Sequence, residues 1–194
     1  MSAAGLILAA GESRRMGSPK ALLRYGEKTF LDTLTGLFGR HCAPVIVVLG
    51  ANAAAIRAAA APSATFVFNP DYALGMTASL QCGLRAVPPD ADGVLFTLVD
   101  HPAASPATVA LVAAAGRGDG PLLRVPRYRA KRGHPIWFSR DLIREFLALP
   151  PDGVARDVVA RHVDRTSYLD LDDPGIVADI DSPEDYRALL GDRA

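Results

Sequence analysis

The chain has 194 residues, of which 49% are hydrophobic and 22% charged, and this composition is ordinary for a globular domain with a substantial core. Its 21 basic and 21 acidic residues give a formal net charge of zero, which argues against nucleic-acid or membrane-surface binding. No apolar stretch approaches the ~20 residues of a transmembrane helix, and the N-terminal charges follow the apolar run, unlike those of a signal peptide. Cys42 and Cys82 lack a metal-binding spacing, so we expect a reduced, cytoplasmic setting. From the charge and the apolar runs we expect no nucleic-acid or membrane partner.

The first 120 residues alternate short apolar runs with helical patterns. The apolar runs predict strands over residues 5–9, 44–49, 64–68 and 93–99. The helical patterns predict helices over residues 29–39, 52–60, 76–86 and 106–115. The first three strands show no alternation of polar and apolar residues, so we expect them to be buried on both faces. Strands and helices that alternate at this spacing predict parallel βαβ units with right-handed crossovers.

The pattern changes after Gly120. Apolar runs at 121–125 and 136–138 flank a basic segment, which predicts a hairpin or long loop inserted in the sheet. Further predicted elements are helices over 139–148 and 154–162, strands near 166–171 and 176–180, and a final helix from Pro183. We therefore predict one three-layer α/β domain over residues 1–194, with a Rossmann-like, mostly parallel mixed sheet that contains at least one antiparallel strand.

The segment that follows the first strand is the most informative in the chain. Residues 8–20 read Leu-Ala-Ala-Gly-Glu-Ser-Arg-Arg-Met-Gly-Ser-Pro-Lys and show no apolar periodicity. A loop of this kind can bring backbone N–H groups and positive charge to an anion, and a nucleoside triphosphate fits best. The spacing disfavours a P-loop, because five residues separate Gly11 from Gly17, and a dinucleotide fingerprint, because Ser and Arg stand at positions 13 and 14.

This segment resembles the signature of the MobA-like nucleotidyltransferases, L-A-[AG]-G-x-[GS]-x-R-M-G-x-x-K. Every fixed position is present, namely Leu8, Ala9, Ala10, Gly11, Ser13, Arg15, Met16, Gly17 and Lys20. The alternative is a glycine-rich turn with surface cations. The resemblance implies the nucleotide-diphospho-sugar transferase type of fold, with nucleotide contacts from Leu8, Ala9, Ala10 and Gly11. It also implies that Arg15 and Lys20 hold the triphosphate and act as catalytic residues.

An acidic residue ends the fourth predicted strand. Asp100 would lie at the carboxyl edge of the sheet, where open α/β sheets bind ligands, and its carboxylate suits a hard cation such as Mg²⁺. Its alternative role is to cap the next helix. The family resemblance places a metal-binding D-x-P motif here, which Asp100 and Pro102 match, and implies that Asp100 is catalytic. His101 fills the variable position, and we interpret it as a bystander or an acceptor contact.

Residues 179–186 resemble the D-I-D-T-P-E-D segment of the same family, with Ser182 in place of Thr. Ser182 and Pro183 would also make a sound helix start, at the N-cap and N1 positions. That role does not account for Asp181, which by resemblance is the second Mg²⁺ ligand. Asp179 is the alternative ligand.

Two further stretches resemble the family. The stretch after the third strand matches the pattern N-P-x-Y/W-x-x-G-x-x-x-S at Asn69, Tyr72, Gly75 and Ser79. By resemblance it lines the base and sugar side of the nucleotide pocket, where Gly75 allows close backbone approach and Asn69 and Ser79 can form hydrogen bonds. A turn before a helix is the alternative.

The second stretch, Gly133-His134-Pro135, resembles a family turn that faces the acceptor. We expect Gly133 and His134 to bind the acceptor. The basic residues around this turn could recognise an anionic acceptor, although surface loops are often basic.

Together the motifs imply a Mg²⁺-dependent transfer of CMP from CTP to a molybdopterin-type acceptor, the molybdenum cofactor, with release of pyrophosphate. Ala10 favours CTP, because the guanylyltransferase branch typically has Leu-Ala-Gly-Gly. The alternatives are transfer from GTP, another phosphate acceptor, and a non-catalytic carrier of molybdenum cofactor. A molybdenum hydroxylase is a candidate recipient of the product.

Overall fold

The computed structural model describes residues 3–60, 63–114, 120–150 and 153–191. Its centre is an eight-stranded sheet in the order β10-β7-β9-β6-β1-β4-β5, with β8 paired to β7. The strands are β1 (Ala3–Ala9), β4 (Cys42–Leu49), β5 (Thr65–Phe68), β6 (Gly93–Leu98), β7 (Leu123–Tyr128), β8 (Lys131–Arg132), β9 (Ile136–Ser139) and β10 (Thr166–Asp170). A separate small hairpin consists of β2 (Arg24–Tyr25) and β3 (Lys28–Thr29).

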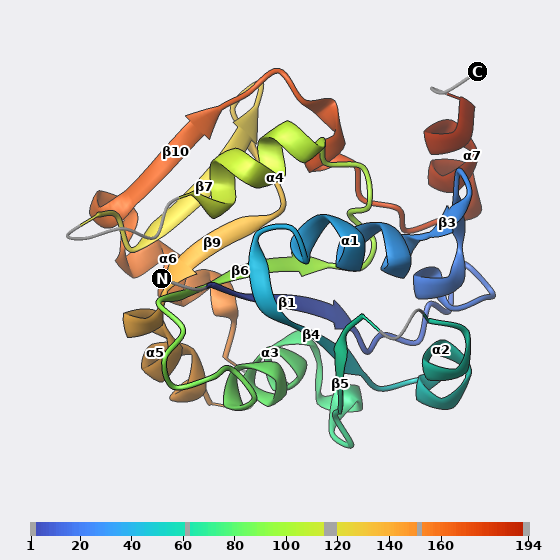
Figure 1. Ribbon diagram of the computed structural model, residues 1–194, viewed down its shortest axis with the longest axis horizontal. Helices are drawn as coiled ribbons and strands as arrows, with labels where there is room; N and C mark the ends of the chain where they lie inside the picture. The colour runs from blue at the N-terminus through green and yellow to red at the C-terminus, as the bar shows by residue number, and fades with distance from the viewer. Residues whose placement is uncertain (1–2, 61–62, 115–119, 151–152, 192–194) are drawn as a thin grey trace.

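Helices cover both faces of the sheet (Figure 1). The α-helices are α1 (Phe30–Phe38), α2 (Ala53–Ala59), α3 (Met76–Arg85), α4 (Pro106–Ala113), α5 (Ile143–Leu147), α6 (Ala155–Arg161) and α7 (Pro183–Gly191). The 3₁₀ turns are η1 (Lys20–Leu22), η2 (Tyr72–Leu74), η3 (Arg140–Leu142), η4 (Val163–Arg165) and η5 (Pro174–Val177). Within the described ranges, none of the helices is long and apolar enough to cross a membrane.

The core is divided by the sheet into two apolar clusters. One cluster joins α1 and α4 to the sheet through Phe30, Phe38 and Val109. The other joins α3, α5 and α6 to the opposite face through side chains that include Phe146 and Val158. This arrangement confirms the predicted three-layer α/β domain.

The parallel half of the sheet places the candidate motifs at one edge. β1 lies between β4 and β6, and β5 adds to the outer side of β4, with all four strands parallel. Their carboxyl ends therefore meet at the same edge, to the right in Figure 1. The prediction that the first three strands are buried on both faces is wrong for β5. It forms the sheet edge, and its Phe68 is 58% exposed.

The second half contains the predicted antiparallel strand. β9 runs antiparallel between β6 and β7, whereas β10 is parallel to β7. The predicted strand near 176–180 is wrong, because η5 occupies 174–177 and the residues up to 182 pair with no strand. The Asp173 carboxylate accepts hydrogen bonds from the N–H groups of Gly175 and Ser105, which favours a turn here. The predicted helix 106–115 ends at Ala113, and residue 115 lies outside the described residues.

A glycine sets the distance between α3 and the sheet. A Cβ atom on Gly83 would lie 2.5 Å from Leu6 Cδ1 and 2.7 Å from Val48 Cγ2. The absence of a side chain therefore lets α3 pack directly on β1 and β4. This contact fixes the start of α3 beside the carboxyl edge, where the candidate site lies.

Candidate functional site

The loop after β1 is folded by its own backbone. The N–H groups of Met16 and Gly17 donate to the Ser13 carbonyl at 3.0 and 3.2 Å. Ser13 and Gly17 have φ angles of 53° and 71°, in the left-handed region. The Ser13 hydroxyl oxygen accepts a hydrogen bond from the Lys20 N–H at 3.1 Å. These turns return the chain so that Lys20 starts η1 beside the end of β1.

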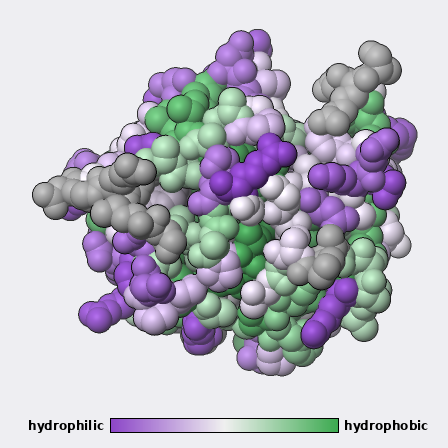
Figure 2. Space-filling view, viewed as in Figure 1, coloured by the Kyte–Doolittle hydropathy of each residue, from purple (hydrophilic) through white to green (hydrophobic). Residues whose placement is uncertain are grey.

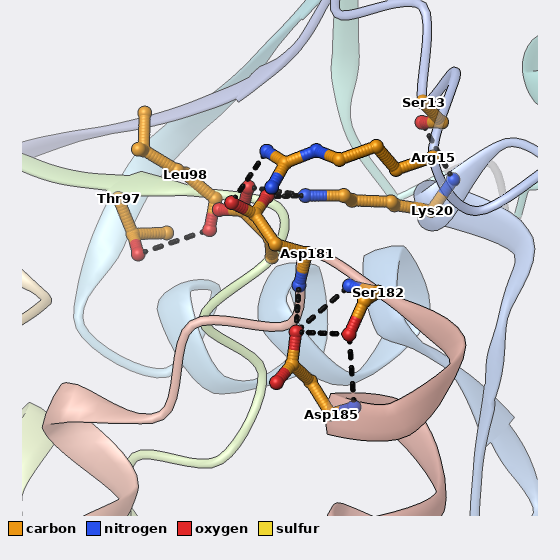
Figure 3. A network of polar contacts seen from close by, with 9 residues as sticks. Ser13, Arg15, Lys20, Thr97, Leu98, Asp181, Ser182 and Asp185 are labelled. Carbon is orange, nitrogen blue, oxygen red and sulfur yellow. Dashed lines mark hydrogen bonds and ion pairs between the residues drawn. The ribbon is translucent and has the colours of Figure 1, made fainter.

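The side chains of Arg15 and Lys20 point toward Asp181 at this edge (Figure 3). Lys20 Nζ donates to Asp100 Oδ2 at 2.9 Å and to Asp181 Oδ1 at 2.5 Å. Arg15 Nη2 donates to Asp181 Oδ2 at 2.6 Å. The Lys20 side chain is only 11% exposed, whereas that of Arg15 is 71% exposed. The sequence-predicted residues Arg15, Lys20, Asp100 and Asp181 therefore form one cluster.

The cluster is electrically balanced. Burial lowers the pKa of Lys20, but its hydrogen bonds to Asp181 and Asp100 outweigh that effect and raise it above its ordinary value. The hydrogen bond from Lys20 and that from Arg15 lower the pKa of Asp181. Near neutral pH Lys20 and Asp181 are therefore charged and paired.

A helix cap holds Asp181 in place. The Asp185 carboxylate accepts hydrogen bonds from the N–H groups of Asp181 and Ser182, at 3.1 and 2.8 Å. In return, the Ser182 hydroxyl accepts the Asp185 N–H at 3.2 Å, which confirms Ser182 as the N-cap of α7. The Ile180 N–H donates to the Asp100 carbonyl, so this segment is also tied to the end of β6.

A cavity of about 350 Å³ opens above the cluster, a size suited to a small-molecule ligand. Ten sequence-predicted residues line it, namely Leu8, Ala9, Ala10, Gly11, Arg15, Lys20, Gly75, Ser79, Asp100 and Asp181. Ile56 and Met76 also line it, and the sequence analysis missed both because neither belongs to a recognised motif or has a reactive side chain. Arg14 lines it as well, but its side chain forms an ion pair with Glu12.

Asn69 lies behind the cavity wall and is not among the residues that line it in the described part of the chain. It is 3% exposed, and its Nδ2 donates to Ser79 Oγ at 3.0 Å. Asn69 therefore orients Ser79. Gly75 precedes α3 with φ 113° and ψ −173°, a conformation that is essentially restricted to glycine.

The predicted acceptor turn packs against η5 and residues at the end of β6. The His134 N–H donates to the Ile176 carbonyl at 2.9 Å, and a Cβ on Gly133 would lie 2.4 Å from that oxygen. The His134 ring contacts the rings of Phe96 and His101, with centroid distances of 5.7 and 4.7 Å. Neither Gly133 nor His134 is among the described residues that line the cavity.

The basic residues near this turn are partly committed to other contacts. Arg127 forms two hydrogen bonds to the Asp170 carboxylate, at 2.9 and 2.8 Å. The guanidinium groups of Arg127 and Arg132 both lie over the Tyr168 ring. Hydrophilic residues gather at the top of the face in Figure 2, where β7 and β10 end in Figure 1. The basic segment therefore lies at the surface, and acceptor binding by Gly133 and His134 stays a prediction.

The carboxylates at this edge suit a hard divalent cation. Asp100 Oδ1 is buried and has no hydrogen-bond partner within the described ranges, so the atom lacks compensation for its lost water. Both oxygens of Asp181 are engaged by Arg15 and Lys20. The exposed Asp179 lies instead near Asp100 and His101. The oxygen donors of Asp100 and Asp181 fit Mg²⁺ chemistry, provided that the cation replaces the Lys20 and Arg15 contacts.

Comparison with known proteins identifies the family. The family model described as the MobA-like NTP transferase domain matches residues 5–166. The chain belongs to the MobA-like NTP transferase family. Among this family's curated relatives, the Escherichia coli (strain K12) protein named molybdenum cofactor cytidylyltransferase is 30% identical over 93% of this chain and 92% of its own length. The Paenarthrobacter nicotinovorans protein named nicotine blue oxidoreductase is 32% identical over 96% of this chain and 95% of its own.

A solved structure agrees with this assignment. The crystal structure of Rv0371c from Mycobacterium tuberculosis H37Rv has a TM-score of 0.82 and 34% identity, and covers 98% of this chain and 99% of that one. The same protein in complex with manganese has a TM-score of 0.77 and 32% identity, over the same shares of the two chains. The MobA-like fold predicted from residues 8–20 is thereby confirmed.

Proposed function

We propose that this protein is a divalent-metal-dependent nucleotidyltransferase that transfers CMP from CTP to molybdopterin-type molybdenum cofactor. The observation that carries the proposal is the cluster of Lys20, Asp100 and Asp181 at the floor of the cavity. It joins the cations needed by a triphosphate to the carboxylates needed by its metal ion. A carrier that binds the cofactor without chemistry would need neither.

In the proposed reaction, a terminal phosphate oxygen of the acceptor attacks the α-phosphorus of CTP. A new P–O bond forms, the bond between the α-phosphorus and its bridging oxygen to the β-phosphate breaks, and pyrophosphate leaves with the electron pair. Lys20 and Arg15 would exchange their carboxylate contacts for phosphate oxygens and stabilise the charge that builds on the leaving group. The backbone of Leu8–Gly11 would hold the nucleotide and fix the line of attack.

The freed carboxylates of Asp100 and Asp181 would hold Mg²⁺, with Asp179 as the alternative to Asp181. Bound there, the cation would neutralise phosphate charge and lower the cost of bringing two anions together. The exchange is balanced, because each cation that turns to the triphosphate leaves a carboxylate for the metal ion. This partner exchange explains how a paired cluster can serve an anionic substrate.

Two observations support CTP over GTP. Ala10 lies in the cavity wall, where the guanylyl branch typically has glycine, and the cytidylyltransferase relative matches along nearly the whole chain. The matches to mycobacterial proteins named probable molybdenum cofactor guanylyltransferase span 23% of the chain, at 49% identity over 47 residues. Ser79, held by Asn69, is our candidate contact to the base edge.

A second candidate function is an oxidation–reduction, since a relative of comparable similarity is named an oxidoreductase. The paired Lys20, Asp100 and Asp181 favour transfer, because reduction of a ligand does not need a metal–triphosphate site. The two functions differ in their products: only transfer releases pyrophosphate.

The experiment is a pyrophosphate-release assay with the purified chain and Mg²⁺. CTP and GTP are each supplied with and without molybdenum cofactor, and the dinucleotide product is identified by mass spectrometry. We expect release from CTP that requires the cofactor. Cofactor-dependent release from GTP but not from CTP would instead identify guanylyl transfer. No release with either nucleotide would overturn the proposal, and reduction of nicotine blue by an added reductant would then test the second candidate.

A further inference from the structure

A second cavity lies beside the hairpin of β2 and β3. Its volume is about 340 Å³, close to that of the cavity at the candidate site. Its walls come from the hairpin, from α1 with the turn after it, and from residues 102–106, which lead into α4. α1 and α4 lie on the same face of the sheet (Figure 1). None of the described residues lines both cavities, so the second cavity is a separate space.

The second cavity has positive charge without an internal counter-ion. Lys28 and Arg40 line it, and no acidic residue is among its described lining residues. Neither cation forms an ion pair or a side-chain hydrogen bond within the described ranges. Asp173 reaches this wall through the Ser105 N–H, but its carboxylate is also engaged by the Thr108 hydroxyl. The cations of the candidate site are paired internally, whereas these two are available to an external anion.

A glycine inside α1 leaves space beside one of these cations. Gly36 is not among the described glycines with positive φ, so its backbone conformation does not require glycine. Within the described chain, a Cβ atom on Gly36 would have only Lys28 Nζ within 4 Å, at 3.9 Å. This is an ordinary contact, unlike the clash that a Cβ on Gly83 would make. Glycine weakens a helix relative to alanine, so what the missing side chain provides here is room beside the Lys28 ammonium.

The remaining walls suit an apolar group. Leu37, Pro102 and Pro106 line the cavity with apolar surface, and Tyr25 adds an aromatic side chain. Apolar walls with a few charged groups are typical of sites that bind small molecules. A ligand with both a ring and an anionic group would match the whole cavity, whereas a free inorganic anion would match only the two cations.

We propose that this second cavity binds a small phosphorylated ligand that carries a ring, with the phosphate held by Lys28 and Arg40. A phosphate monoester carries close to two negative charges at neutral pH and offers several acceptor oxygens. It therefore matches one ammonium and one guanidinium group, and its ring would pack against Leu37 and Pro102. The proposal does not rest on nucleotidyl transfer, because the two cavities share no described lining residue.

The experiment titrates the full chain with phenyl phosphate and follows the backbone N–H signals by two-dimensional ¹H–¹⁵N NMR. We expect saturable shifts in the signals of residues 33–37 and 103–105. Phenyl phosphate should bind at least about tenfold more tightly than inorganic phosphate or phenol, because each of these probes matches only part of the cavity. Lys28→Gln and Arg40→Gln should each weaken phenyl phosphate binding by about tenfold or more.

Two further variants separate space from charge. Gly36→Leu keeps both cations but fills the space beside Lys28, so it should abolish binding while the helical circular dichroism signal is retained. Arg144→Gln removes an exposed cation from α5, on the opposite face of the sheet, and should leave affinity unchanged.

Three results would overturn the proposal. They are the absence of saturable shifts at residues 33–37 and 103–105, equal binding of inorganic phosphate and phenyl phosphate, and unchanged affinity in Lys28→Gln. Shifts confined to residues 8–20 would place the probe in the candidate site and would also contradict it. The wild-type titrations decide the matter even if a variant fails to fold.

Discussion

The two oxygens of the Asp100 carboxylate differ in what surrounds them. On the cavity side, Oδ2 accepts a hydrogen bond from Lys20 within a cluster of paired charges. The other oxygen, Oδ1, is buried and has no hydrogen-bond partner in the described ranges. In the proposed reaction, the paired oxygen becomes available only when a substrate replaces Lys20, whereas the unpaired oxygen has no internal partner to exchange. One carboxylate thus combines a satisfied acceptor with an unsatisfied one.

The largest effect on the cavity side should come from Lys20→Ala. This change removes a positioned charge, so we expect kcat for CTP-dependent pyrophosphate release to fall by about 10²–10³-fold. Arg14→Ala is the matched control, because Arg14 lines the same cavity but pairs with Glu12. Steady-state kinetics on both variants, with folding checked by circular dichroism, test this. A folded Lys20→Ala protein with full activity would refute the assigned role of Lys20.

Asp181→Asn should have the next largest effect. The substitution keeps the side-chain shape but removes the charge that pairs with Lys20 and Arg15. Since hydrogen bonds to charged groups contribute about 1.5–3 kcal/mol, we expect kcat/KM to fall by roughly 10–100-fold. The Mg²⁺ concentration at half-maximal rate should rise as well. An unchanged Mg²⁺ dependence, measured by titration at saturating CTP, would instead favour Asp179 as the second ligand.

A smaller effect should follow from loss of the α7 cap. Asp185→Asn weakens the acceptor of the Asp181 and Ser182 N–H groups, and we expect unfolding free energy to fall by about 0.5–2 kcal/mol. Glu184→Gln is a close control, since it removes the same charge from the same helical turn but affects only the surface pair with Arg187. Chemical denaturation of both variants isolates the cap. Equal losses would mean that the helix dipole, not the cap, is responsible.

The smallest effect concerns pH. Because the folded protein lowers the pKa of Asp181, this group contributes stability that is present above its unfolded pKa of ~3.9 and is lost as pH falls through the folded value. The Tm difference between wild type and Asp181→Asn should therefore shrink as pH is lowered from about 5 to about 3. Thermal melts across that range measure it. A difference that grows on acidification would contradict the ion-pair assignment.

The sequence predicted the parallel half of the fold well, because its signals are local. Continuous apolar runs identify β1, β4 and β6, and the fixed spacing of residues 8–20 places Lys20 after β1. The third strand was correctly located but wrongly expected to be buried. Its composition resembles that of its neighbours, and only the strand order shows that β5 lies at the edge.

The rest of the site depends on contacts between distant segments. Asp181 was predicted from a resemblance, but its pairing with Arg15 and Lys20 follows from how α7 docks. His101 was interpreted as a bystander or acceptor contact because it fills the variable position of its motif, and the sequence does not show that its ring packs against His134. Its neighbours Asp179 and His134 come from separate segments that follow β6. Likewise, Asn69 matched the pocket motif but acts through Ser79, a distinction that depends on burial.

The distance in sequence between Lys20 and Asp181, 161 positions, has a consequence for synthesis. Chains fold from the N-terminus as they emerge from the ribosome, so β1, β4 and β6 can form the nucleotide wall early. Asp181 follows Asp173, whose carboxylate ties the returning segment to Ser105 and Thr108. Until then Lys20 has one carboxylate partner, Asp100, and Arg15 lacks its partner Asp181. The nascent protein therefore gains its complete charge cluster only after residue 181 has been synthesised, which withholds the assembled centre from shorter partial chains.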